Sequence, residues 1–255
     1  MENEFMKFQE YGTDHEDTIL LLHGGGLSWW NYRETAEILK NEYHIILPIL
    51  DGHAGSDRPF TTIEDNASEI ISFIDRHLNG SALLIGGLSL GGQILLEMLS
   101  KRKDICSFAL VESAAVIPSK LTNALIAPAF GSCYGLIKNR GFARLQFRSL
   151  HIKPELFEDY YRDTCLIKKQ DMIAFLKANT SYALKESIRD VSAEVHVYCG
   201  DKETKEIKRS VGVICKALPA CSTETPNGYY HGEFSINHPE EYADTVKKIL
   251  SHRSP

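Results

Sequence analysis

Short apolar runs alternate with helix-like segments over the first 112 residues of the chain. The runs lie at residues 18–22, 44–50, 82–85 and 107–111, and the first three end at loops that contain glycine. Between the second and third runs, apolar residues recur at steps of three and four over residues 63–78, which predicts an amphipathic helix. Short buried strands that alternate with helices are typical of a mostly parallel sheet covered by helices.

The pattern changes between residues 113 and 190. Strand-like runs disappear there, and helical segments with many aromatic side chains take their place. A strand-like run returns at 195–199, and helical patterns continue to the end of the chain. We therefore expect one α/β domain, built from residues 1–112 and 191–255, with a helical insert at 113–190. The insert should cover the strand ends, where α/β proteins bind their ligands.

A serine stands where the third apolar run meets a helical pattern. Residues 87–91 read Gly-Leu-Ser-Leu-Gly, with Ser89 at the centre. This G-x-S-x-G sequence is typical of a nucleophile elbow, in which a strand turns sharply into a helix and the serine occupies a strained apex. The two glycines remove side chains that would collide with the neighbouring strand and helix. The hydroxyl then lies at a helix N-terminus, which favours developing negative charge.

Four motifs stand in an order that resembles the α/β-hydrolase superfamily. They are His-Gly-Gly-Gly at 23–26, Gly-His-Ala-Gly-Ser at 52–56, the elbow at Ser89, and a late His-Gly at 231–232 before Pro-Glu-Glu. Ala54 departs from the glycine that is usual in the second motif. The resemblance covers nearly the whole chain and is strongest to capped esterases and C–C hydrolases. It implies a mostly parallel central sheet flanked by helices, with an inserted helical cap.

The resemblance also assigns a base to Ser89. A serine hydroxyl becomes a nucleophile when a histidine accepts its proton and a carboxylate orients that histidine. In this fold the chain order is serine, acid, histidine. Of the ten histidines, His231 matches the final His-Gly loop of the family. His238 is the competitor, but its position before Pro-Glu-Glu indicates the start of the last helix and a surface or capping role.

Three carboxylates compete for the place of the acid. The family usually has G-x-x-D after the strand at 195–199, and the matching position here is Glu203, a glutamate instead of an aspartate. Asp201 has the usual residue type at the wrong offset. Glu112 follows the strand at 107–111, an acid position that some relatives use. We favour Glu203 and leave the other two open.

The oxyanion formed during attack needs two backbone N–H donors. Leu90, directly after the serine, is expected to supply one. Gly25, in the loop after the first strand, is the favoured source of the other, because glycine lets the backbone approach the acyl oxygen. His23 is expected to brace this loop and to take no part in the chemistry.

These residues predict a serine hydrolase that acts on a small-molecule ester or thioester, without metal or organic cofactor. A C–C bond hydrolase, or a lyase of the menaquinone-synthesis type acting on an acidic substrate, has the same triad, so the fold does not separate them. A non-catalytic protein that binds a small molecule is the third interpretation. Arg140, Arg144 and Arg148 repeat every four residues and could attract an acidic substrate, although such a stripe is more often a solvated face.

Composition and charge limit the partners and the location that we expect for this protein. The net charge of −6 argues against nucleic-acid binding, and no apolar stretch is long enough to span a bilayer. The first eleven residues lack the pattern of a signal peptide, so a cytoplasmic location is expected. No C-x-x-C pair or zinc spacing occurs, which favours six reduced thiols. The cysteines are Cys106, Cys133, Cys165, Cys199, Cys215 and Cys221.

Overall fold

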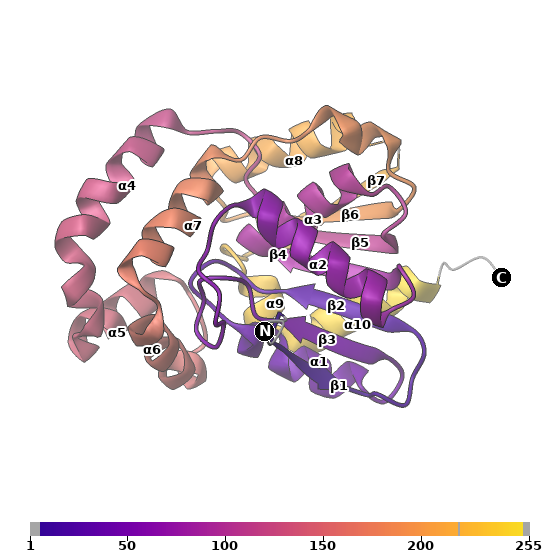
Figure 1. Cartoon of the computed structure of the whole chain (residues 1–255), viewed down its shortest axis with the longest axis horizontal. Helices are drawn as coiled ribbons and strands as arrows, with labels where there is room; N and C mark the ends of the chain where they lie inside the picture. Colours follow the sequence, from indigo (N-terminus) through magenta and orange to yellow (C-terminus); the bar gives the residue numbers. More distant parts are fainter. Residues whose placement is uncertain (1–5, 219, 252–255) are drawn as a thin grey trace.

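The apolar runs of the sequence lie side by side as the central strands of one twisted sheet (Figure 1). The computed structural model describes residues 6–218 and 220–251, so the first five residues of the N-terminal segment lie outside it. Within these ranges the strand order is β1-β3-β2-β4-β5-β6-β7, and β1 alone runs antiparallel to its neighbour. This arrangement confirms the predicted α/β-hydrolase architecture. The strands are β1 (Phe8–Tyr11), β2 (Thr18–Leu22), β3 (His44–Pro48), β4 (Ala82–Leu88), β5 (Cys106–Glu112), β6 (Glu194–Tyr198) and β7 (Cys221–Glu224).

Helices cover both faces of the sheet because successive side chains of a strand point to opposite sides. Leu20 and Leu22 of β2 belong to one buried cluster, while Ile19 and Leu21 belong to the other. The first cluster is completed by α2 (Ile63–His77), α3 (Leu90–Lys101) and α8 (Lys205–Ala217). The second is completed by α1 (Arg33–Leu39), α9 (Glu233–Asn237) and α10 (Pro239–Ser251), with η1 (Trp29–Tyr32) beside them.

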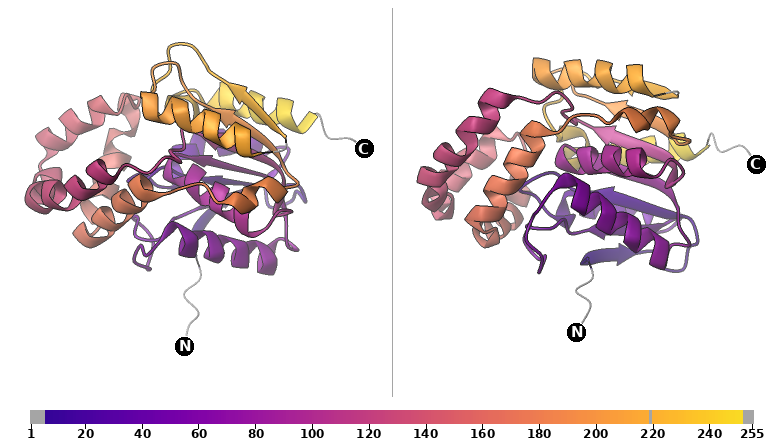
Figure 2. Two further views of the ribbon diagram at one scale, coloured as in Figure 1. Left: turned by 90° about the horizontal axis from the view of Figure 1, so that it is seen from above. Right: turned by 45° about the horizontal axis from the view of Figure 1, so that its top comes forward.

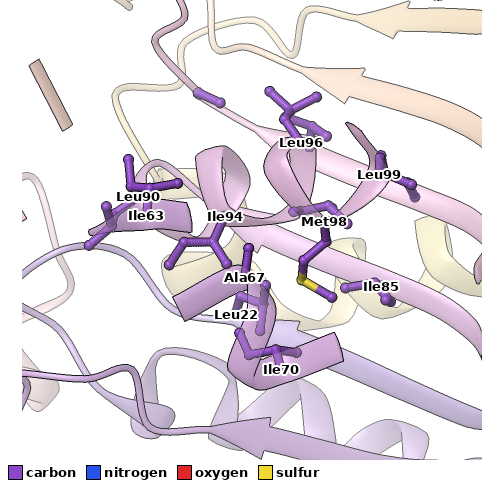
Figure 3. Close-up of a cluster of buried hydrophobic side chains, with 14 of the residues drawn as sticks. Leu22, Ile63, Ala67, Ile70, Ile85, Leu90, Ile94, Leu96, Met98 and Leu99 are labelled. Atoms are coloured by element: carbon purple, nitrogen blue, oxygen red, sulfur yellow. The ribbon is translucent and has the colours of Figure 1, made fainter. Parts of the chain in front are cut away.

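The predicted helix at 63–78 is α2, and its first turn shows why it begins there. Thr62 is extended, and its hydroxyl accepts a hydrogen bond from the N–H of Asp65 at 2.9 Å. A side-chain cap of this kind satisfies one of the free N–H groups of a helix start. The apolar stripe of α2, including Ile63 and Ile70, then packs beside Ile94 of α3 (Figure 3). This packing holds the helix that begins immediately after Ser89.

The helical segment 113–190 lies at the end of the sheet where the parallel strands finish (Figures 1 and 2). Buried polar contacts join it to the core. The indole Nε1 of Trp30 donates to Asp163 at 2.8 Å, and the N–H of Phe60 donates to Asp171 at 2.9 Å. Its elements are α4 (Lys120–Cys133), η2 (Tyr134–Lys138), α5 (Arg140–Ser149), η3 (Pro154–Leu156), α6 (Phe157–Leu166), α7 (Lys169–Ser181) and η4 (Glu186–Asp190).

Both edge strands were absent from the sequence prediction. β7 exposes most of its residues, and β1 exposes its two central ones, so neither forms an apolar run. Hydrogen bonding to a buried neighbour, β3 or β6, makes these polar segments strands. Among the described residues, no helix combines the length and the apolar character needed to cross a membrane.

The cysteine prediction was wrong for one pair. Cys215 of α8 and Cys221 of β7 form a disulfide, with 5.4 Å between their Cα atoms. The two cysteines are six residues apart in the chain, a spacing without a recognisable motif. Free thiols are present at Cys106, Cys165 and Cys199, as expected, and the side chain of Cys133 lies outside the described part of the structure.

Candidate active site

Ser89 occupies the sharp turn between β4 and α3. Its backbone has φ 52° and ψ −109°, a region that residues with a side chain rarely adopt. Its N–H donates to the carbonyl of Glu112 at 2.8 Å, which ties the turn to the neighbouring strand β5. A Cβ on Gly91 would lie 2.2 Å from the carbonyl oxygen of Leu22, and one on Gly87 would lie 2.5 Å from that of Gly91. The two glycines are therefore a steric requirement of the turn.

His231 and Glu203 meet beside this turn, although 28 residues separate them. Nδ1 of His231 lies 3.1 Å from each carboxylate oxygen of Glu203. A carboxylate accepts hydrogen bonds only, so Nδ1–H is the donor and Nε2 is left free to accept a proton. The Glu203 side chain is 1% exposed and the His231 side chain 47% exposed. The imidazole therefore has a buried partner on one side and access to the pocket on the other.

The surroundings of His231 favour its protonated form more than water favours that of a free imidazole. Burial lowers the pKa of His231, but the hydrogen bond and charge of Glu203, and the charge of Glu112, outweigh it, so the pKa is raised. A raised pKa makes the neutral imidazole a stronger base, which favours removal of a proton from a nearby hydroxyl.

Asp201 has another partner. Its Oδ1 accepts a hydrogen bond from the N–H of Gly228 at 2.6 Å, and its Oδ2 lies 3.6 Å from Nζ of Lys202. Asp201 thus holds the loop that leads to His231, whereas Glu203 contacts the imidazole itself.

Glu112 is buried behind the turn, with 2% of its surface exposed. Its Oε1 accepts from the N–H of Ser235 at 3.3 Å, while Oε2 is a buried atom without a hydrogen-bond partner. Burial raises the pKa of Glu112 to about 7. Through its carbonyl and its carboxyl, this residue joins the Ser89 turn to the helix that follows His231.

His238 lies away from these groups. Its ring stacks on Tyr229 with 4.4 Å between centroids, and its Nε2 is 4.0 Å from the carboxylate of Glu233. It belongs to the start of the last helix, as its sequence position indicated.

One pocket contains the serine, the histidine and the carboxylate. It has a volume of about 270 Å³, and Ser89, Glu203 and His231 lie in its wall. Gly25 also lines it, and a Cβ on Gly25 would lie 3.5 Å from Cβ of Leu90. The two expected oxyanion donors are therefore neighbours. The remaining lining residues are Gly24, Leu27, Leu88, Ser149, Leu150, His151, Ile152, Lys202, Thr204, Tyr230 and Ile236.

Two buried histidines brace the glycine loop. Nε2 of His23 accepts from the N–H of Leu50 at 3.1 Å, and its Nδ1 lies 2.9 Å from the carbonyl of Gly24. Nε2 of His53 accepts from the N–H of Gly26 at 3.0 Å. Burial lowers the pKa of His53 to about 4 and that of His23 well below its usual value, so both are neutral acceptors. The bracing role of His53 escaped the sequence prediction, although the residue stands within the Gly-His-Ala-Gly-Ser motif.

The arginine stripe does not reach the pocket. Arg140 and Arg144 pack over the ring of Phe157 at 5.3 and 4.9 Å, and Arg140 also pairs with Glu158. Arg148 is exposed on the same helix, and none of the three lines the pocket around Ser89. In the structure the stripe is a solvated and partly stacked face of α5.

The sheet order and the strained serine turn define an α/β-hydrolase fold. The chain belongs to the alpha/beta hydrolase family, whose sequence profile matches residues 19–245. It is 30% identical over 118 residues to Lipase 3 of Moraxella sp. (strain TA144), a match that covers 43% of this chain and 37% of that protein. The chain thus matches little more than a third of that lipase.

Solved structures of the same fold have diverged far in sequence. An esterase from Thermogutta terrifontis superimposes with a TM-score of 0.79 at 18% identity, covering 96% of this chain and 93% of that one. The enol-lactonase of Burkholderia xenovorans LB400 gives 0.82 at 15% identity, with 97% and 96% covered. A bromoperoxidase from Bacillus anthracis gives 0.82 at 13%, with 96% and 94% covered. These likenesses establish the fold, and the family with its esterase and lipase relatives supports hydrolase activity.

Proposed function

We propose that the protein is a serine hydrolase that cleaves a carboxylic ester or thioester of a small molecule. The contact between His231 and Glu203, in the same pocket as Ser89, carries this proposal. Glu203 keeps the imidazole oriented with Nδ1 protonated, and Nε2 takes the proton of the Ser89 hydroxyl as the oxygen attacks the carbonyl carbon.

The tetrahedral oxyanion rests on the N–H groups of Gly25 and Leu90, at the start of α3. His231 then gives its proton to the leaving alcohol or thiol, which departs and leaves Ser89 acylated. In the second half, His231 removes a proton from water, the hydroxide attacks the acyl carbon, and the carboxylic acid leaves as Ser89 regains its proton. No metal or organic cofactor enters these steps.

The ester is favoured over a carbon–carbon bond for two reasons. The relatives of the chain include an esterase and a lipase by name. Arg140, Arg144 and Arg148, the residues that could have attracted an acidic substrate, lie outside the pocket. Ester hydrolysis is therefore the reaction that the site supports best.

Labelling by a fluorophosphonate probe, followed by turnover of p-nitrophenyl acetate, tests this proposal. The wild-type protein should be labelled and should release p-nitrophenol, and Ser89→Ala should lose both properties. A folded wild-type protein that is neither labelled nor active would favour the interpretation as a binding protein.

A further inference from the structure

One wall of the pocket comes from the helical segment 113–190. The end of α5 and the turn after it supply Ser149, Leu150, His151 and Ile152 to the lining. Another part of the lining comes from the loop that contains Tyr230 and His231. The helical segment and this loop therefore share the lining of the pocket.

They meet in a ring stack. The imidazole of His151 lies parallel to the ring of Tyr230, with 3.8 Å between centroids and an interplanar angle of 6°. We call this pair the rim stack. Both residues line the pocket, and Tyr230 directly precedes His231 in the chain. The stack thus joins the helical segment to the loop of the proposed base.

The backbone of His151 has an uncommon conformation beside this contact. Its φ is 57°, in the left-handed region that side chains disfavour. Asn237 of α9 holds the turn from the core: its Nδ2 donates to the carbonyl of His151 at 2.7 Å, and its Oδ1 accepts from the N–H of Lys153 at 2.9 Å. Strained backbone of this kind persists where surrounding contacts determine it, and it is concentrated at functional sites.

The enclosed volume is small. At about 270 Å³, the pocket is at or below the lower end of the range of roughly 300–1,000 Å³ usual for ligand sites. Leu27, Leu88, Ile152 and Ile236 make much of the interior apolar. The site therefore fits a short hydrocarbon group. His151 and Tyr230 line the pocket and are also exposed to solvent, so the rim stack lies at the edge of the pocket.

We propose that the rim stack of His151 and Tyr230 restricts the substrates of this protein to esters with short acyl chains. This inference rests on the proposed ester hydrolysis. His151 and Tyr230 are specificity-determining residues here, because they line the pocket without taking part in proton transfer or attack.

The test removes the imidazole ring of His151 with substitutions that its backbone conformation tolerates. His151→Asn and His151→Gly both suit a left-handed position, so both variants should fold, which thermal unfolding checks. His238→Ala is the matched control, because it removes a second histidine–tyrosine stack, on Tyr229, outside the pocket lining.

The kcat/KM for p-nitrophenyl acetate, butyrate and octanoate is measured for each protein. The wild type should prefer acetate or butyrate, and the octanoate-to-acetate ratio should rise by about tenfold or more in both His151 variants, as expected when a few methylene groups gain room. The ratio should stay unchanged in His238→Ala. Equal ratios in the wild type and the His151 variants would overturn the proposal.

A binding measurement tests the role of the rim stack independently of ester hydrolysis. In Ser89→Ala, titration calorimetry with butanoate and octanoate should show octanoate binding strengthened by about tenfold when His151→Asn is added. If the wild type hydrolyses no ester, the proposed function fails, and octanoate binding still decides the role of the rim stack. Unchanged octanoate binding in the double variant counts against it.

Discussion

Both carboxylate oxygens of Glu203 lie 3.1 Å from Nδ1 of His231, and the carboxylate is almost completely buried. A buried carboxylate can hold an imidazole in one tautomer more firmly than an exposed one, because water does not compete for the hydrogen bond. Glutamate, one methylene longer than the usual aspartate, reaches the ring from the third position after Gly200.

Replacing this carboxylate should abolish most activity. Glu203→Gln keeps the shape but removes the charge and favours the wrong tautomer, so kcat for p-nitrophenyl acetate should fall by roughly 10³-fold or more. Asp201→Asn is the matched control, because Asp201 holds Gly228 and does not contact the imidazole. A larger loss in Asp201→Asn than in Glu203→Gln would reverse the assignment of the acid.

The pH profile should report the raised pKa of His231. Nε2 must be unprotonated to accept the serine proton, so kcat/KM should rise with pH through a midpoint above the usual histidine value of 6.5. Glu203→Gln removes the hydrogen bond and charge that raise this pKa, so the midpoint of its residual activity should move to lower pH. A midpoint that stays in place would mean that Glu203 does not set the titration of the base.

Glu112 should make stability depend on pH. Its pKa in the folded protein is about 7 against a usual 4.5. The contribution of Glu112 to the free energy of unfolding is therefore fully present below pH 4.5 and is lost as pH rises through 7. The loss should approach about 3 kcal/mol at alkaline pH. Urea unfolding at pH 5 and pH 8 measures it.

The matched variants for that experiment are Glu112→Gln and Glu186→Gln. Glu112→Gln should flatten the change in the free energy of unfolding between the two pH values, because an amide does not ionise. Glu186 is exposed, and its variant should keep the wild-type slope. Parallel curves for Glu112→Gln and the wild type would show that Glu112 does not titrate in this range.

A pair of glycine substitutions tests the turn at Ser89. Gly91→Ala places a methyl group 2.2 Å from the carbonyl oxygen of Leu22, so the backbone must move, and both activity and the free energy of unfolding should fall sharply. Gly212→Ala is in the interior of α8, where the new Cβ meets no heavy atom within 4 Å beyond its chain neighbours and the backbone of its own helix, and the variant should be stabilised by about 0.5–1 kcal/mol. Similar melting temperatures for the two variants would contradict this account.

The arginine stripe should be dispensable for catalysis. Because Arg140, Arg144 and Arg148 lie outside the pocket, replacing all three by alanine should leave KM within about twofold for both neutral and acidic esters. A KM that rises for acidic esters alone would show that these arginines do interact with the substrate.

Local sequence was sufficient for the strand–turn–helix around Ser89, because each requirement of that turn is a local one. An apolar run, two glycines in fixed positions and a helical pattern place the serine without help from distant residues. The mostly parallel sheet could be predicted from the alternation of short apolar runs with helical patterns along the chain. The edge strands β1 and β7 did not, because their partners, and not their own polarity, make them strands.

Tertiary structure decided what depends on distant segments. Asp201 and Glu203 are two residues apart, and only the approach of the loop to His231 shows which carboxylate the imidazole contacts. The Cys215–Cys221 disulfide and the rim stack of His151 and Tyr230 have no pattern in the sequence, because each joins side chains whose separation the fold alone sets. Chemistry that resides in one turn can be predicted from one turn, whereas an acid partner and a pocket wall require the packed chain.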